Sequence, residues 1–306
     1  MGWASPPLCF KLAGFFSDLH YYFSYRDRRA VENNLRIILS HRKSDENISS
    51  LTRQVFRNFG RYLVEFFMMG KMVNEAYVKK NVKIKNLERI SRILKEGKGG
   101  IVITAHLGNW ELGAVLLTML GYPLFAIALP HKERPVNDLF NHQRETRGIA
   151  VIPTRMAFRR CLEALKENKL IALVADRDFS LNGEPVDFLG RKTLIPTGPA
   201  VFSLMTGAPI IPTFLIRDCD GTFTLSISEP IYPPLNVAKE DERQALLDIM
   251  RGYLSVIERE IYLYPTQWLM FRKFWIQDPP RRPSVLKRIF RLRKKTNIVL
   301  NEGKRS

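Results

Sequence analysis

The stretch "GIVITAHLGNWELGA" (residues 100–114) decides the fold class of this chain. Its first five residues form an apolar, β-branched run that follows a glycine, which is typical of a buried strand. Gly108 and Asn109 suit a turn, and the apolar residues that follow have the spacing of a helix that ends near Leu120. A buried strand that leads directly into a helix is the repeating unit of a parallel sheet.

The same alternation continues on both sides of this stretch. We expect further strands at 82–84, 123–129, 149–153, 170–175, 208–216 and 222–228. We expect helices between them, at about 87–97, 135–147, 157–168, 198–207 and 240–264. The pattern predicts an α/β fold with a mostly parallel sheet that is flanked by helices on both faces.

The remaining segments predict three regions. Residues 1–80 read as an N-terminal helical, membrane-surface region, 81–280 as the α/β domain, and 281–306 as a basic amphipathic tail. The aromatic segment at 6–25 is interrupted by charged and polar residues, so it favours a helix lying on a membrane surface, with an ordinary core helix as the alternative. No run reaches the roughly 18–20 apolar residues of a membrane-spanning helix.

The charge of the chain limits the class of its partners. Its 306 residues contain 48 Lys and Arg against 30 Asp and Glu, a net charge of +18. This sign favours nucleic acid, anionic lipid or an acidic protein. No zinc pattern, helix-turn-helix signal or RNA-binding aromatic motif supports nucleic acid. The three cysteines, Cys9, Cys161 and Cys219, match no metal spacing and indicate reduced thiols of a cytosol-facing protein.

His106 ends the predicted strand, and Glu111 lies in the first turn of the helix that follows. In an open α/β sheet ligands bind beyond the carboxyl ends of the strands, so His106 is expected to point into that crevice. A histidine with a nearby carboxylate is a general-base arrangement. The alternative is a histidine satisfied by backbone and a glutamate that caps the helix.

Several segments resemble the lipid A biosynthesis acyltransferase family, a branch of the glycerolipid acyltransferase superfamily. "HLGNWE" at 106–111 resembles its His-x4-Glu signature, and the other matching segments follow in family order. They are "NNLRIILS" (33–40), "ERPVNDLFNHQRETRG" (133–148), the block from 174 to 212, and "YPTQWLMFRKFW" (264–275). The chain departs from the family in a short, interrupted N-terminal anchor, in Arg177, and in Phe188-Leu189-Gly190.

The resemblance implies transfer of a fatty acyl group from a thioester to a hydroxyl of a lipid A precursor-like glycolipid. His106 would be the general base, Glu111 would hold the imidazole tautomer, and Arg144 would bind the oxyanion or a phosphate. Amides at the helix start after His106 are alternative oxyanion donors. The full set of expected site residues is catalytic His106, Glu111, Arg144 and Asp176, and substrate-binding Asn109, Arg177 and Asp178. No metal or cofactor is expected.

The expected partners are an acyl carrier protein or acyl-CoA as the donor, a glycolipid acceptor and an anionic membrane surface, with no nucleic acid. The resemblance places the chain on the cytoplasmic face of the inner membrane, peripheral or monotopic. The alternative acceptors are a phosphatidylinositol mannoside or a glycerophospholipid. A basic nucleic-acid-binding protein and a metal-dependent hydrolase are alternatives from other classes.

Overall fold

The computed structural model describes residues 5–41, 47–128, 133–153, 156–178 and 183–275. The basic tail expected at 281–306 lies outside these residues. Within them, seven strands form one sheet in the order β1-β9-β8-β2-β5-β3-β4. All neighbouring strands are parallel except β8 and β9. The strands are β1 (Val82–Lys85), β2 (Gly100–Thr104), β3 (Leu124–Ala128), β4 (Ala150–Pro153), β5 (Leu170–Val174), β8 (Ile210–Arg217) and β9 (Phe223–Ile227).

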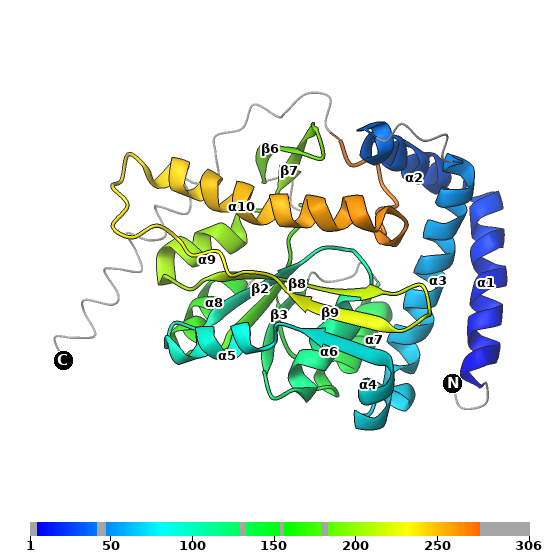
Figure 1. The fold of residues 1–306 in the computed structure, drawn as a ribbon, viewed down its shortest axis with the longest axis horizontal. Coiled ribbons are helices and arrows are strands. Elements are labelled where there is room, and N and C mark those ends of the chain that lie inside the picture. Colours follow the sequence, from blue (N-terminus) through cyan, green and yellow to red (C-terminus); the bar gives the residue numbers. More distant parts are fainter. Residues whose placement is uncertain (1–4, 42–46, 129–132, 154–155, 179–182, 276–306) are drawn as a thin grey trace.

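Helices cover both faces of this sheet, which confirms the predicted α/β class (Figure 1). One face carries α5 (Glu88–Lys95), α6 (Trp110–Met119) and α7 (Arg134–Glu145). The other carries α8 (Ala157–Lys166), α9 (Gly198–Thr206) and α10 (Glu242–Leu263). The face of α10 that packs toward the sheet carries five apolar side chains at helical spacing, all of them buried: Leu246, Met250, Tyr253, Ile257 and Ile261.

Four further helices precede the sheet: α1 (Pro6–Phe23), α2 (Tyr25–Ile38), α3 (Ile48–Met72) and α4 (Glu75–Asn81), with a 3-10 turn at Leu39–His41. Helix α1 lies along the outside of α3 at one end of the molecule (Figure 1). Asp18 of α1 accepts hydrogen bonds from Arg53 and Arg57 of α3, with Nη2–Oδ2 distances of 2.6 and 2.7 Å. Across the described residues, every helix is too short or too polar to cross a bilayer.

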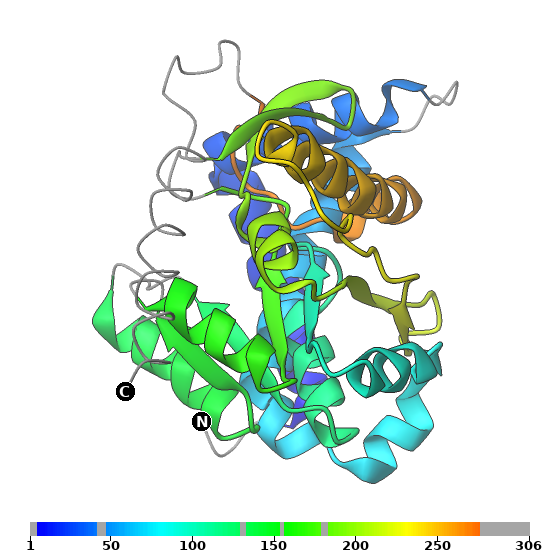
Figure 2. The ribbon, with the colours of Figure 1, turned by 90° about the vertical axis from the view of Figure 1, so that its left-hand side faces the viewer.

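One element was not expected from the sequence, a two-stranded antiparallel hairpin of β6 (Glu184–Phe188) and β7 (Arg191–Ile195). Its turn places Leu189 at φ 52° and Gly190 at φ 75°. Leucine rarely adopts this left-handed conformation, so Leu-Gly does not read as a hairpin turn. The Leu189 N–H donates to Glu258 of α10, and Figure 2 shows hairpin and helix together above the sheet.

Candidate active site

Strand register brings His106 and Asp176 together. Strands β2 and β5 are parallel neighbours, and Thr104 lies opposite Val174 at their carboxyl ends. Two residues beyond each strand end stand His106 and Asp176. The imidazole Nδ1 is 2.8 Å from Asp176 Oδ1, and the His106 backbone N–H donates to Oδ2 at 3.0 Å. Two residues 70 positions apart thus form a pair at the sheet edge where ligands bind.

The Asp176 carboxylate is fully buried and ionised. Burial acts to raise the pKa of Asp176, but the charge of His106 and hydrogen bonds from His106 and Trp268 outweigh it and hold this pKa below its ordinary value. An ionised carboxylate only accepts hydrogen bonds, so Nδ1 of His106 carries the proton and Nε2 is the basic nitrogen. The side chain of His106 is 18% exposed. This arrangement suits proton transfer at Nε2.

Glu111 was expected to hold the imidazole tautomer, but its carboxylate pairs with Arg144, and the carboxylate that contacts the imidazole Nδ1 is that of Asp176. The Glu111 carboxylate forms a bidentate pair with Arg144 of α7: Nη2 lies 2.6 Å from Oε1 and Nε lies 3.0 Å from Oε2. The reason is geometric, because Glu111 sits in the first turn of α6 and faces α7, whereas the adjacent strand end supplies Asp176 to the ring. Glu111 therefore joins two helices beside the site.

The Arg144 side chain is mostly buried in this pair, with 14% of its surface exposed, rather than lying on a solvated helix face. Burial acts to lower the pKa of Arg144, but the hydrogen bonds and charge of Glu111 raise it overall. The guanidinium also contacts Asn141 and lies 5.7 Å from the centre of the Phe140 ring. Its planar fork is thus occupied by protein groups, and the oxyanion role expected for it has no support in this geometry.

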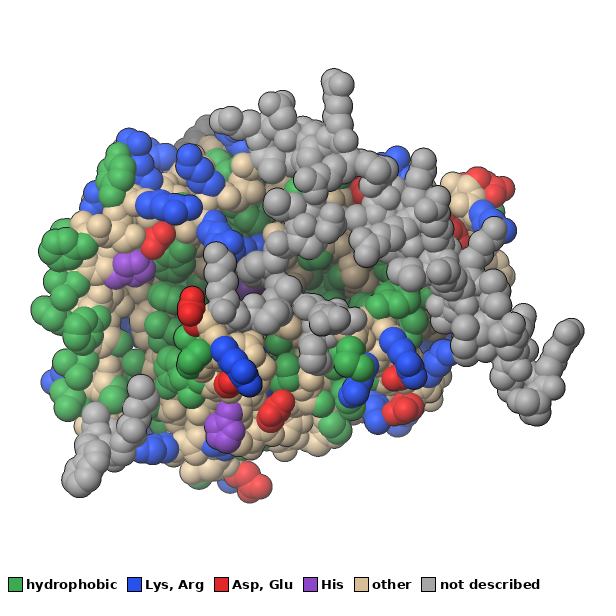
Figure 3. Space-filling view, turned by 180° about the vertical axis from the view of Figure 1, so that it is seen from behind, with side chains coloured by type: hydrophobic (Ala, Val, Ile, Leu, Met, Phe, Trp, Pro, Cys, Tyr) green, Lys and Arg blue, Asp and Glu red, His purple; other side chains and the backbone are tan. Residues whose placement is uncertain are grey.

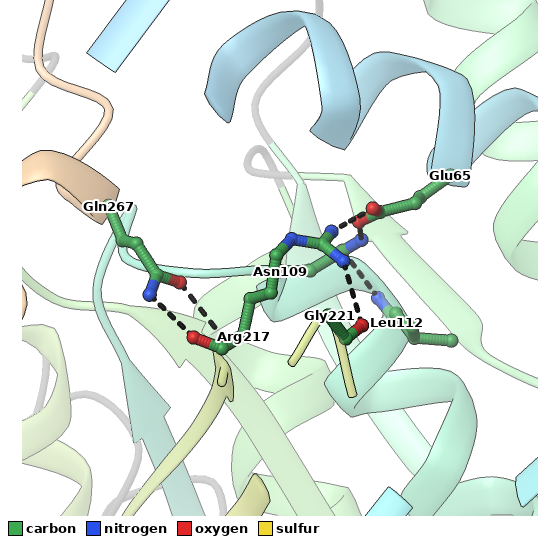
Figure 4. A network of polar contacts seen from close by, with 6 residues as sticks. All are labelled: Glu65, Asn109, Leu112, Arg217, Gly221 and Gln267. Atoms are coloured by element: carbon green, nitrogen blue, oxygen red, sulfur yellow. Dashed lines mark hydrogen bonds and ion pairs between the residues drawn. The ribbon is translucent and has the colours of Figure 1, made fainter. Parts of the chain in front are cut away.

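Asn109 was expected to bind substrate, and the structure places its side-chain amide in hydrogen bonds within the protein. Its Oδ1 accepts from the Leu112 N–H at 3.0 Å and caps α6, while its Nδ2 donates to Glu65 Oε2 at 2.7 Å (Figure 4). The residue is 1% exposed. Both ends of the amide are used within the protein, because the first turn of a helix needs an acceptor for its N–H groups.

Arg177 and Asp178 follow Asp176 at the same strand end. Burial, followed by the nearby charge of Arg272, lowers the pKa of Arg177 to about 10. Asp178 Oδ2 accepts a hydrogen bond from the Gly183 N–H at 2.5 Å. Their place beside the His106–Asp176 pair keeps both as candidates for substrate contact.

Four polar residues that support the loop after His106 were missed as site residues: Glu65, Arg217, Gln267 and Trp268. Arg217 pairs with Glu65 (Figure 4). The Gln267 amide accepts from the Arg217 N–H at 3.0 Å and donates to the Arg217 carbonyl at 2.8 Å. The segment "PTQWLMF" was the available signal, because a glutamine and a tryptophan beside a buried apolar run need hydrogen-bond partners.

Residues 267–269, which start at the last residue of the 3-10 turn Pro265–Gln267, hold the His106 loop by backbone pairing. The Leu269 N–H donates to the His106 carbonyl at 2.7 Å, and the Gly108 N–H donates to the Gln267 carbonyl at 3.0 Å. The Asn109 N–H donates to the Leu215 carbonyl at 3.0 Å. The amides of Gly108 and Asn109 are therefore committed, so an oxyanion donor must come from another group.

Aromatic rings pack beside His106. The Trp110 ring stands edge-on to the imidazole with centroids 5.0 Å apart, and Tyr62 stacks on Trp110 at 4.5 Å. Phe59 stacks on Tyr62 at 6.1 Å and also contacts Phe271. An apolar environment next to a basic nitrogen suits a substrate with a hydrocarbon chain.

Comparisons with known proteins identify the family of this chain and several relatives. The profile of the family described as bacterial lipid A biosynthesis acyltransferase matches residues 5–277. A phosphatidylinositol mannoside acyltransferase of Mycolicibacterium smegmatis is 28% identical over 232 residues, covering 74% of this chain and 73% of the relative. A lipid A biosynthesis palmitoleoyltransferase of Escherichia coli is 24% identical over 284 residues, covering 92% of this chain and 88% of the relative.

Proposed function

Because this chain belongs to the bacterial lipid A biosynthesis acyltransferase family, and is therefore an O-acyltransferase, we propose that His106 is its general base and that Asp176 orients the imidazole. The observation that carries the proposal is the contact of 2.8 Å between Nδ1 and a buried carboxylate. Glu111 and Arg144 form a supporting pair beside the two residues.

The proposed reaction joins the acceptor oxygen to the acyl carbon of a thioester. Nε2 of His106 takes the hydroxyl proton as the oxygen attacks the carbonyl carbon, because a neutral hydroxyl is a poor nucleophile. Asp176 stabilises the imidazolium that forms. The tetrahedral intermediate then breaks its C–S bond, and the imidazolium returns the proton to the leaving thiolate.

The donor is proposed to be an acyl carrier protein or acyl-CoA, both of which are acidic and suit a chain of net charge +18. The acceptor is proposed to be a lipid A precursor-like glycolipid, as the family match favours. A phosphatidylinositol mannoside is the second candidate, since the mycobacterial relative shares 28% identity against 24% for the enterobacterial one.

We further propose that α1 rests on the cytoplasmic face of the inner membrane. In the space-filling view from behind, hydrophobic side chains gather along the edge formed by α1 (Figure 3). Exposed side chains on this helix include Leu8, Leu12, Phe15, Phe16 and Phe23, with Phe23 at 83%. An apolar face of this kind can bury itself in the headgroup region while Asp18 ties the opposite face to α3.

The test is an acyl-transfer assay with purified protein, a radiolabelled acyl thioester and either a lipid A precursor or a phosphatidylinositol mannoside. We expect a labelled, more apolar product from one acceptor. His106→Ala should reduce turnover by ~10²–10⁴ because a general base is lost. Near-full activity of folded His106→Ala, checked by circular dichroism, would reject His106 as the base.

A further inference from the structure

The indole of Trp268 completes the shell around Asp176. Its Nε1–H donates to Asp176 Oδ2 at 2.8 Å, while the imidazole occupies Oδ1. We propose that Trp268 is a positioning residue, whose N–H locks the Asp176 carboxylate and thereby the orientation and basicity of His106. This inference rests on the proposed function of the His106–Asp176 pair.

The need for this donor follows from the burial of Asp176. A fully buried charge is costly unless its lone pairs accept hydrogen bonds. Among the described residues, three donors serve this carboxylate: the imidazole, the His106 N–H and the indole. The indole is the one donor of the three that does not belong to His106, and it shares Oδ2 with the His106 backbone N–H. Without the indole, a single backbone N–H would hold Oδ2, and the carboxylate would be less firmly fixed against the imidazole.

Trp268 is held rigidly enough to perform this task. It is 3% exposed, and its ring stands edge-on to Phe274 with centroids 5.2 Å apart. Its backbone pairs with Leu107 in an antiparallel bridge, next to the Leu269 bond to the His106 carbonyl. One short segment therefore positions the backbone of the base and the carboxylate that orients it.

The chain offers a matched control in Trp275. Its ring centre lies 6.5 Å from that of Trp268, and it packs on the same Phe274. Its Nε1 is buried but finds no acceptor among the residues that the structure covers. Trp275→Phe removes an N–H and ring area from the same cluster without removing a hydrogen bond to the site.

The experiment compares Trp268→Phe, Trp275→Phe and a variant with 3-benzothienylalanine at position 268, which keeps the bicyclic shape but lacks the N–H. We expect both position-268 variants to lose about 10- to 100-fold in kcat with little change in KM, as for other residues that orient a catalytic group. The acid limb of their pH–rate profile should move to higher pH, because a carboxylate with one donor fewer stabilises the imidazolium more strongly. Trp275→Phe should match the unmodified enzyme.

The two variants at position 268 separate the N–H from packing. Full kcat with an unshifted acid limb in folded benzothienylalanine protein would overturn the inference, even if Trp268→Phe is inactive or unfolded. An equal loss in Trp275→Phe would overturn it too, since packing alone would then explain the effect. His106→Ala, assayed in parallel, tests the proposed function separately. If His106→Ala keeps its activity, the proposed base is rejected. If His106→Ala is inactive and the benzothienylalanine protein is fully active, only the role of Trp268 is rejected.

Discussion

At the scale of single residues, the paired charges of the site make separate predictions. Asp176→Asn keeps the shape of the side chain but removes the charge that fixes the imidazole tautomer. We expect a loss in kcat on the order of 10²–10⁴, with a smaller change in KM. Steady-state kinetics on folded protein measure this, and unchanged kcat would leave Asp176 a purely structural residue.

The same substitution predicts a pH dependence of stability. Because the folded-state pKa of Asp176 is lowered, its charge stabilises the fold above the unfolded-state pKa of about 3.9. This contribution is lost as the pH falls through the folded-state value. The Tm difference between the unmodified protein and Asp176→Asn should therefore shrink below about pH 4. Thermal melts from pH 7 downward test this, and a constant difference would contradict it.

Glu111 predicts a different phenotype from Asp176. Glu111→Gln leaves the mostly buried Arg144 guanidinium without its charge partner, and breaking a fully buried pair costs about 3–5 kcal/mol, which is an upper bound here. We expect a large loss in the free energy of unfolding, measured with urea. The double variant Glu111→Gln, Arg144→Met should recover part of it. Lost turnover with full stability would instead place Glu111 in the chemistry.

At the scale of elements, the turn between β2 and α6 depends on one glycine. Gly108 has φ 64°, and a Cβ built on it would lie 2.1 Å from the Leu215 carbonyl oxygen. Gly108→Ala should therefore shift this turn and reduce both Tm and kcat. Gly121→Ala is the matched control, because Gly121 also has positive φ but a Cβ there meets nothing within 4 Å. Equal effects of the two substitutions would show that steric contact with Leu215 is unimportant.

The local elements could be predicted from the sequence, but the contacts between them could not. Strand β2 falls at the predicted residues because its apolar run and glycines act locally. Asp176 meets His106 because β5 lies between β2 and β3, an order that the sequence of elements does not reveal. The role of Glu65 could not be predicted for a similar reason. A carboxylate on a long helix is usually exposed to solvent, and only the fold places Arg217 beside it.

At the scale of the whole molecule, the charge and the exposed face of α1 predict membrane binding. Phe15→Glu with Phe16→Glu should weaken co-sedimentation with anionic vesicles, because both rings are more than half exposed. Leu235→Glu is the control, since Leu235 is 81% exposed but lies outside α1. High salt should weaken binding of all three proteins. Equal binding of the control and the α1 variant at low salt would contradict the proposal.

The long-range hydrogen bonds around the His106 loop bear on how the enzyme reaches its active state. Asn34 donates to the Met270 carbonyl across 236 positions, and Asn58 donates to the Thr266 carbonyl across 208. Closing such distant contacts carries a large entropic cost before any stabilisation is gained, so they form late. During refolding, helical circular dichroism should therefore recover before catalysis. Turnover then reports completed folding, and a partly folded chain transfers no acyl group.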